Sequence, residues 1–225
     1  MPRLANLFWR AFTGAQSHLA TGNDRSRRYA PGFPPIIAFA DPAKPDFASL
    51  ADYCERGTRF YIAEWKGDAP AGWKIEIDTF MCAMIRTRNP EPAKSPAEVV
   101  RLGARHVDQM VAMAALTKPG PFATRPMQIG EWYGVLDGDK LVAMAGERAA
   151  DGNYREISGV CTLPEYQGRG YARVLTDRVI RSQLDRGLTP FLHVASANTR
   201  ARMLYERMGF DVDQECAMRV VTRVD

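Results

Sequence analysis

The sequence feature that most constrains the fold is Gln167-Gly168-Arg169-Gly170, which separates two segments of different hydrophobic pattern. Residues 154–163 have the pattern of a β-strand, and a helical pattern begins at Tyr171. Two glycines leave the backbone without Cβ atoms, so successive N–H groups can point into one concavity. The helix adds the unpaired N–H groups and the positive dipole end of its first turn. The strand, the glycine turn and the helix therefore predict an anion-binding site.

The spacing of the glycines excludes two common classes of nucleotide site. A nucleotide P-loop ends in Gly-Lys-Ser/Thr, and no lysine follows Gly170. A dinucleotide-binding turn has a third glycine at the position where Arg173 stands. The anion is therefore expected to belong to a different kind of ligand.

These residues resemble the Gln/Arg-x-x-Gly-x-Gly/Ala motif of the GNAT acetyltransferase superfamily. The flanking sequence extends the resemblance. Pro164-Glu165-Tyr166 precedes the motif, and Asn198 and the run Ala201-x-x-Leu204-Tyr205-Glu206-x-x-Gly209-Phe210 follow it. The resemblance covers residues 97–225. It implies a GNAT fold of the α/β (α+β) class with a mixed central sheet, and acetyl-coenzyme A as the co-substrate without a metal.

The resemblance also implies which residues hold the cofactor. In the family the pyrophosphate lies on the glycine turn, and the pantetheine arm pairs with the end of the preceding strand. A backbone N–H there can point at the thioester carbonyl, and losing such a donor costs about 3 kcal/mol. Asn198 contacts the pantetheine arm in the family, and it could also simply cap the following helix. The implied cofactor-binding residues are Val160, Cys161, Thr162, Gln167, Gly168, Arg169, Gly170, Tyr171, Ala172 and Asn198.

Glu156 is the candidate catalytic base. An alkyl amine with a pKa of about 10.4 is charged at pH 7, so a base must remove its proton before it can attack. Glu156 stands eleven positions before Gln167, and some family members carry a catalytic glutamate at the matching position. The alternative is a carboxylate on the strand surface that pairs with Arg148 or Arg155.

Tyr205 is the second candidate catalytic residue, because many family members hold a tyrosine beside the cofactor sulfur at this position. Proton transfer from a phenol with a pKa of about 10 to a thiolate whose conjugate thiol has a pKa of about 8.5 costs roughly 2 kcal/mol. We therefore expect Tyr205 to stabilise the departing sulfur by a hydrogen bond. The alternative is a core aromatic, since Tyr205 lies four residues after Ala201 on the apolar face of its helix.

The cysteines and histidines suggest no further chemistry. Cys161 and His193 could form a nucleophile pair, but a thioester needs no enzyme nucleophile, and a strand cysteine usually packs as a small apolar residue. The sequence contains no C-x-x-C pair and no histidine at metal-ligand spacing from a cysteine. We therefore expect reduced thiols, a cytoplasmic protein and no metal site.

The 225 residues are long enough for one large domain or two small ones. Residues 1–90 predict an α/β half-domain, and prolines at positions 90, 92 and 96 place the boundary before residue 97. This arrangement is similar to the glycine N-acyltransferase-like branch, in which a reduced acetyltransferase-like unit precedes the complete one. In residues 1–90 we expect helices at 4–12 and 47–56, a loop at 23–28, and strands at 36–39, 59–64 and 74–85.

Residues 97–225 predict the complete acetyltransferase domain. We expect strands at 98–102, 131–136, 140–146, 154–163, 191–195 and 215–222, and helices at 104–116, 171–187 and 201–208. Turns at Asp137-Gly138 and Asp151-Gly152-Asn153 make three consecutive strands antiparallel. The irregular stretch at 117–122 lies where the family places a loop over the acceptor site.

Composition excludes two classes of partner. The net charge is only +4 and the arginines are scattered, whereas a nucleic-acid surface needs clustered charge. No window of about 18 apolar residues is present, so no membrane span is expected. The sequence therefore predicts an N-acetyltransferase for a small-molecule amine or amino acid, with residues 1–90 walling one side of the acceptor cleft. The alternative is a non-catalytic acyl-coenzyme A binding or regulatory module. Oligomeric state is not predicted.

Overall fold

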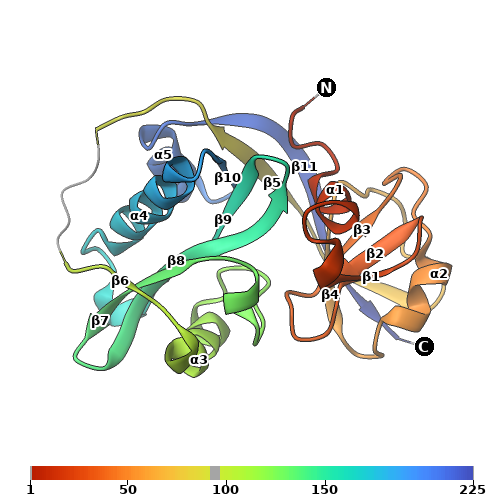
Figure 1. Ribbon diagram of the computed structural model, residues 1–225. Coiled ribbons are helices and arrows are strands. Elements are labelled where there is room, and N and C mark those ends of the chain that lie inside the picture. The colour runs from red at the N-terminus through yellow and green to blue at the C-terminus, as the bar shows by residue number, and fades with distance from the viewer. Residues whose placement is uncertain (1, 92–96, 225) are drawn as a thin grey trace.

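The computed structural model describes residues 2–91 and 97–224, whose β-strands form one continuous sheet (Figure 1). Within these residues the sheet has eleven strands in the order β1-β2-β3-β4-β11-β5-β10-β9-β8-β7-β6. Most neighbouring strands are antiparallel, but β3 pairs with β4, and β10 with β9, in parallel. The predicted mixed α/β class is therefore confirmed.

The first part of the chain contributes five strands and two short helices to the described structure. The strands are β1 (Ala20–Gly22), β2 (Ser26–Tyr29), β3 (Ile36–Phe39), β4 (Arg59–Ala63) and β5 (Trp73–Arg86). The helices are α1 (Leu7–Thr13) and α2 (Phe47–Leu50), with 3₁₀ turns at Ser17–Leu19 and Ala51–Tyr53. The predicted strands at 36–39, 59–64 and 74–85 are confirmed, the last of them as one long strand.

Two local predictions for this part are wrong. The helix expected at 47–56 ends early, because Arg223 donates to the carbonyls of Ala51 and Cys54 that a longer helix would use. The loop expected at 23–28 contains β2. Arg28 can lie in this strand because its buried guanidinium donates to Glu55 Oε2 at 2.8 Å and lies 4.7 Å from the centre of the Phe60 ring.

The second part contributes the remaining strands and the longer helices. The strands are β6 (Val100–Arg101), β7 (Trp132–Asp137), β8 (Lys140–Asp151), β9 (Tyr154–Thr162), β10 (Thr189–Ala195) and β11 (Phe210–Arg223). The helices are α3 (Val107–Thr117), α4 (Tyr171–Asp185) and α5 (Thr199–Arg207), with 3₁₀ turns at Ala104–His106, Pro126–Gln128 and Pro164–Tyr166. The predicted order is confirmed, including the antiparallel β7, β8 and β9.

The long strand β5 joins the two parts of the chain. It lies between β10 and β11 and pairs antiparallel with both, from Arg86 opposite Phe210 to Trp73 opposite Arg223 on the β11 side (Figure 1). The prolines at 92 and 96, on which the predicted domain boundary rests, lie outside the described residues. Residues before that boundary thus supply an interior strand to the sheet of residues 97–225.

Helices cover the sheet on both sides. Figure 1 shows α3 and α4 on opposite sides of β8, and their apolar residues share one buried cluster with β7, β8, β9 and β10. A second cluster packs α1 against β2, β3 and the C-terminal end of β5. None of the helices in the described part of the chain is long and apolar enough to span a membrane.

Two glycines in the left-handed region fix the ends of α4. Gly170 has φ of +82° at the N-terminus and Gly187 has φ of +70° beyond the C-terminus. At the C-terminal end, Gly187 N–H donates to Leu184 O and Leu188 N–H donates to Gln183 O, both at 2.9 Å. These bonds satisfy the last carbonyls and stop the helix. The position of the α4 N-terminus relative to β9 is therefore set by glycine backbone conformations.

Because β5 is interior, residues 97–225 alone should not fold. Without β5, strands β10 and β11 lose the partner that lies between them, and the sheet is split. We expect this fragment to show no cooperative transition in urea by circular dichroism, whereas the full chain does. Residues 71–225, which keep β5, are the control and should unfold more cooperatively. A sharp, native-like transition of residues 97–225 would contradict the prediction.

Candidate active site

The parallel strands β9 and β10 separate about half-way along their length. Their register runs from Tyr154 opposite Thr189 to Ile157 opposite Leu192 and stops there. Beyond this point β9 remains paired with β8, and β10 remains paired with β5 as far as Ala195. Both strands stay in the sheet, but their facing edges form no ladder with each other in the described structure.

A β-bulge in β9 accompanies the separation. The β8–β9 register shifts between Met144 and Gly146, where β9 has one residue more than β8. Gly159 lies in this bulge with φ of +64°, and a Cβ there would be 2.5 Å from the Trp132 ring. Because a bulge bends its own strand, it directs the second half of β9 away from β10. Val160, Cys161 and Thr162 lie on this half.

The glycine turn after β9 leaves a row of backbone N–H groups without partners. Gly168 has φ of +78° and Gly170 has φ of +82°. The N–H groups of residues 168–173 donate no hydrogen bond to any residue that the structure describes, and Val174 is the first donor, to Gly170 O at 3.2 Å. A Cβ on Gly168 would meet no atom within 4 Å. The predicted strand, turn and helix are confirmed, and they form an open row of donors at the N-terminus of α4.

Side chains fix the approach to this turn. Gln167 Nε2 donates to Thr162 O at 3.4 Å, and the Arg169 guanidinium lies 4.8 Å from the centre of the Tyr166 ring. The Tyr166 hydroxyl donates to Asp137 at 2.6 Å. The β7–β8 hairpin therefore holds the segment before the turn, while Tyr171 and Ala172 at the start of α4 are half-buried and Tyr171 packs on the core.

Two predicted site residues lie near the ends of α5: Asn198 precedes the helix, and Tyr205 lies in its last turn. Asn198 Oδ1 accepts from Ala201 N–H at 3.1 Å, which confirms that it caps the helix. The Tyr205 ring is buried, 6.1 Å from the Phe210 ring, in the same cluster as Val194 of β10. Its hydroxyl makes no hydrogen bond with another described side chain or backbone group, and burial raises the pKa of Tyr205 to about 12. Tyr205 is therefore a core aromatic whose hydroxyl is free for a ligand.

Glu156 is fully buried and fully engaged. Its two carboxylate oxygens accept from Arg148 Nε at 2.8 Å and Nη2 at 2.6 Å, and Oε1 lies 2.7 Å from His193 Nδ1. Burial alone would raise the pKa of Glu156, but the Arg148 guanidinium and the His193 ring hold it well below its ordinary value of 4.5. Of the two predicted partners, Arg148 is confirmed and Arg155 is wrong. The expected place on the strand surface is also wrong, because Glu156 has no solvent-exposed area.

A second bulge, in β8, brings Arg148 onto Glu156. Here Arg148 and Ala149 together oppose Glu156, and Ala149 N–H donates to its carboxylate at 3.2 Å. The backbone groups left unpaired by the bulge bond to a buried side chain from the first part of the chain. Gln16 Nε2 donates to Arg148 O at 2.7 Å, and Gln16 Oε1 accepts from Ala150 N–H at 3.1 Å.

His193 belongs to this cluster and does not pair with Cys161. Its ring stacks on Phe8 of α1 at 5.5 Å, and Phe8 also lies 5.8 Å from the Arg148 guanidinium. Burial raises the pKa of the Cys161 thiol to about 11. Cys161 is therefore a neutral, packed thiol, as the sequence favoured.

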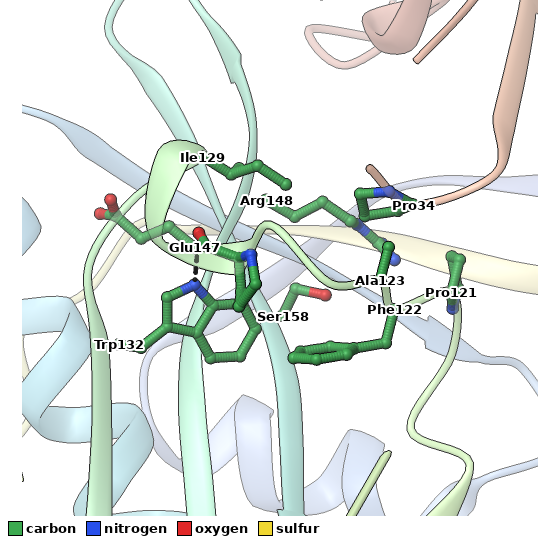
Figure 2. Close-up of a pocket in the computed structure, with 10 residues that line it drawn as sticks. Pro34, Pro121, Phe122, Ala123, Ile129, Trp132, Glu147, Arg148 and Ser158 are labelled. Carbon is green, nitrogen blue, oxygen red and sulfur yellow. Dashed lines mark hydrogen bonds between the residues drawn. The ribbon is translucent and has the colours of Figure 1, made fainter. Parts of the chain in front are cut away.

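A pocket opens beside Arg148, between the first part of the chain and the loop before β7 (Figure 2). Arg148 and Ser158 provide its polar groups, and Phe122 and Trp132, whose rings are 5.2 Å apart, form one apolar wall. The remaining lining residues are Pro34, Pro121, Ala123, Pro126, Ile129 and Glu147. Figure 2 shows the Ser158 hydroxyl pointing into this space from β9.

Sequence reasoning named Arg148 only as an alternative partner of Glu156, and it assigned no role to Ser158, Trp132 or Gln16. Two signals were present. Arg148 lies eight residues before Glu156, across the turn at Gly152, so a hairpin count brings them together. The glycine at 159 inside a strand pattern was a signal for the bulge.

Comparison with known proteins agrees with this geometry. A family model described as FR47-like protein matches residues 132–219. A crystal structure of a proposed GNAT-family acetyltransferase from Novosphingobium aromaticivorans has 33% sequence identity and a TM-score of 0.89, over 99% of both chains. No curated protein matches the chain.

Two further solved structures share the fold at lower identity. A GCN5-related N-acetyltransferase-like protein from Streptococcus suis has 17% identity and a TM-score of 0.63, over 97% of both chains. A GCN5-related N-acetyltransferase from Kribbella flavida has 16% identity and a TM-score of 0.61, over 99% of this chain and 95% of that one. These are proteins of the acetyltransferase fold. The chain described here belongs to the GNAT acetyltransferase superfamily.

Replacing Glu156 by glutamine should destabilise the protein in a pH-dependent way. Breaking one side of a buried ion pair costs about 3–5 kcal/mol, so the free energy of unfolding should fall by that order at pH 7. Because folding lowers the pKa of Glu156, its stabilisation is present above about pH 4.5 and is lost progressively at lower pH. Urea unfolding at pH 7, 5 and 3.5 should therefore show the difference between parent and variant shrinking with acid.

Glu165→Gln is the matched control for this experiment. Glu165 pairs with Lys140 at 2.9 Å on the exposed surface, where ion pairs contribute little. Its removal should leave the unfolding curves nearly unchanged at each pH. Equal stability of Glu156→Gln and the parent at pH 7, or a difference that does not depend on pH, would contradict the prediction.

Proposed function

We propose that the chain is an acetyl-coenzyme A-dependent N-acetyltransferase that acetylates a small amine by direct attack. The observation that carries this proposal is the row of partnerless N–H groups at residues 168–173, at the end of two strands that separate. When bound, acetyl-coenzyme A supplies an acetyl group activated as a thioester. Each remaining requirement of the reaction can be assigned to residues of this chain.

The glycine turn fits a diphosphate. Its N–H groups need an acceptor, the α4 dipole favours an anion, and the space at Gly168 is open. Val160, Cys161 and Thr162 lie on the half of β9 that has no ladder with β10, so their backbone groups are available for the amides of a pantetheine arm. Asn198, at the start of α5, is proposed as a second contact for this arm.

Tyr205 is proposed to stabilise the departing thiolate. The pKa of Tyr205 is about 12. Full proton transfer from Tyr205 to a thiolate whose conjugate thiol has a pKa of about 8.5 would therefore cost about 5 kcal/mol. Donating a hydrogen bond to the sulfur avoids that cost. The absence of a hydrogen-bond partner for the Tyr205 hydroxyl among the described residues supports this role, since a buried phenol usually has one.

Glu156, for which the sequence left a catalytic base and a paired carboxylate as alternatives, is proposed as a positioning residue. Its carboxylate already accepts four hydrogen bonds, and its lowered pKa makes it a weak proton acceptor. Through Nδ1 it orients His193, whose Nε2 has no hydrogen-bond partner in the described structure. An imidazole held in this way can accept a proton on Nε2, so His193 or a water beside it is the proposed route for the amine proton.

The first part of the chain is proposed to limit the size of the acceptor. Pro34 lines the pocket beside Arg148, opposite the loop that carries Pro121 and Phe122. This arrangement suits a small molecule better than a protein surface. The likeness of residues 1–90 to the reduced unit of the glycine N-acyltransferase-like branch stays a prediction.

Thioester consumption tests the proposal against the non-catalytic alternative. The purified chain is incubated with acetyl-coenzyme A and a panel of small amines and amino acids, and free thiol is measured over time. Turnover that depends on the amine supports the enzyme. Tight coenzyme A binding by calorimetry, with no turnover on any amine, would leave only the binding module.

Gly168→Val should abolish coenzyme A binding. A Cβ at this position would meet no atom within 4 Å, so the valine side chain would extend into the space proposed for the diphosphate, and we expect affinity to fall by at least about 100-fold. Calorimetry measures this loss. Gly187→Val is the matched control, because Gly187 has φ of +70° with no atom within 4 Å of its Cβ position, and it lies at the opposite end of α4. Equal affinities of the two variants for coenzyme A would contradict the proposed diphosphate site at the glycine turn.

Tyr205→Phe should lower kcat without changing stability. The hydroxyl makes no hydrogen bond in the described protein, so its removal leaves packing intact and removes only the donor for the sulfur. We expect kcat to fall by about 10- to 100-fold, with an unchanged Kd for coenzyme A and an unchanged Tm. An unaltered kcat under conditions in which chemistry limits the rate would assign Tyr205 to the core alone.

A further inference from the structure

Among the described residues, the guanidinium of Arg148 bonds through only one of its edges. Its Nε and Nη2 donate to the two carboxylate oxygens of Glu156 at 2.8 and 2.6 Å. Its Nη1 donates no hydrogen bond to any residue of the described ranges. A guanidinium carries five N–H donors in a rigid fork. Because Glu156 fixes one edge, the other edge is held in place with its donors unused.

The unused edge faces the pocket of Figure 2. A Cβ on Gly120 would lie 3.9 Å from Arg148 Nη1, so this nitrogen lies beneath the loop at residues 117–122. Figure 2 shows the Arg148 side chain reaching across the pocket toward Pro34 and Ala123. The Ser158 hydroxyl points into the same space and has no hydrogen-bond partner among residues 2–91 and 97–224. Two free donors therefore meet in one small pocket.

No acidic group of the pocket competes for these donors. Glu147 is the other charged residue in the lining, and its carboxylate is already occupied outside the pocket. It accepts from Gln183 Nε2 at 3.1 Å, from Glu131 N–H at 3.1 Å, and from Arg186. Figure 2 shows the Glu147 carboxylate directed away from Ser158. The other lining residues have apolar side chains, so no carboxylate among the lining residues is free to take these donors.

We propose that this pocket binds the carboxylate of the acceptor, through Arg148 Nη1 and the Ser158 hydroxyl. A planar monoanion with two oxygens matches two converging donors. Because Glu156 already balances the charge of Arg148, a single negative charge suits the site better than a dianion. The inference rests on the proposed function and narrows it, since the acceptor becomes an amino acid or a related amino carboxylate.

Matched acceptors test this proposal directly. Each amino acid of the panel is compared with the amine that lacks its carboxylate and with its amide, for example L-phenylalanine with phenethylamine and L-phenylalaninamide. We expect kcat/KM for the best amino acid to exceed that for both analogues by about 100-fold, because a site built for hydrogen bonding rejects a ligand that leaves its donors unpaired. Plain amines acetylated as well as, or better than, their parent amino acids would overturn the proposal.

Two variants connect this preference to the named residues. Ser158→Ala should lower kcat/KM for the amino acid by about tenfold and leave the value for the matching amine unchanged. Arg148→Lys should remove the preference altogether, since an ammonium cannot hold Glu156 and a ligand in the same fork. Arg28→Lys is the matched control, because Arg28 is also buried and paired with a glutamate but lies outside the pocket. If Arg148→Lys does not fold, Ser158→Ala and the matched acceptors decide. Equal losses for both acceptor classes would assign these residues to structure alone.

A binding measurement separates this inference from the proposed function. The probe 3-phenylpropionate carries the carboxylate without an amine, and 3-phenylpropanamide is its neutral control. Calorimetry should give at least about tenfold tighter binding of the carboxylate, lost in Ser158→Ala. Carboxylate binding of this kind without acetylation of any amine would contradict the proposed acetyltransferase activity and support the carboxylate site. Acetylation of amines without a preference for a carboxylate would support the proposed acetyltransferase activity and contradict the carboxylate site.

Discussion

The structure depends on β10 leaving β9 without leaving the sheet. Two parallel strands can separate only if each keeps another partner, because an unpaired interior strand would leave its backbone groups unsatisfied. Here β8 holds β9 on one side, and β5 holds β10 as far as Ala195 on the other. Both strands are therefore held by other partners where they separate, and the glycine turn follows the half of β9 that has no ladder with β10. The proposed cofactor site follows from this pairing.

The first part of the chain completes that arrangement at two levels. At the level of the sheet, it supplies β5, without which β10 would have no second partner. At the level of the site, Gln16 closes the bulge that presents Arg148, and Phe8 stacks on His193. Residues 1–90 contain no chemical motif of their own, but they hold Arg148 and His193 of the proposed site in position. This is a physical reason for residues 1–90 to be retained beside the acetyltransferase motif.

Local features of this fold could be predicted from the sequence, and long-range pairings could not. The glycine turn, α4 and the antiparallel strands β7 to β9 follow from periodicity and from glycines at turns, which act within a few residues. Nothing in residues 73–86 indicates that they lie between β10 and β11, since any apolar strand could pair there. Glu156 shows the same limit. Its partner Arg148 lies across one turn and was foreseen, whereas His193, 37 residues away, was not.

The burial of Glu156 needs a reason beyond stability. A buried ion pair seldom stabilises a protein more than apolar residues of the same volume would, because both charges lose their hydration. What apolar residues cannot provide is orientation. By binding Nε and Nη2, Glu156 leaves a single way for the Arg148 guanidinium to point, and Nη1 then faces the pocket. The same carboxylate fixes the His193 ring through Nδ1. One buried charge thus sets the direction of two side chains on β8 and β10, on either side of β9, which is the basis of the positioning role proposed for Glu156.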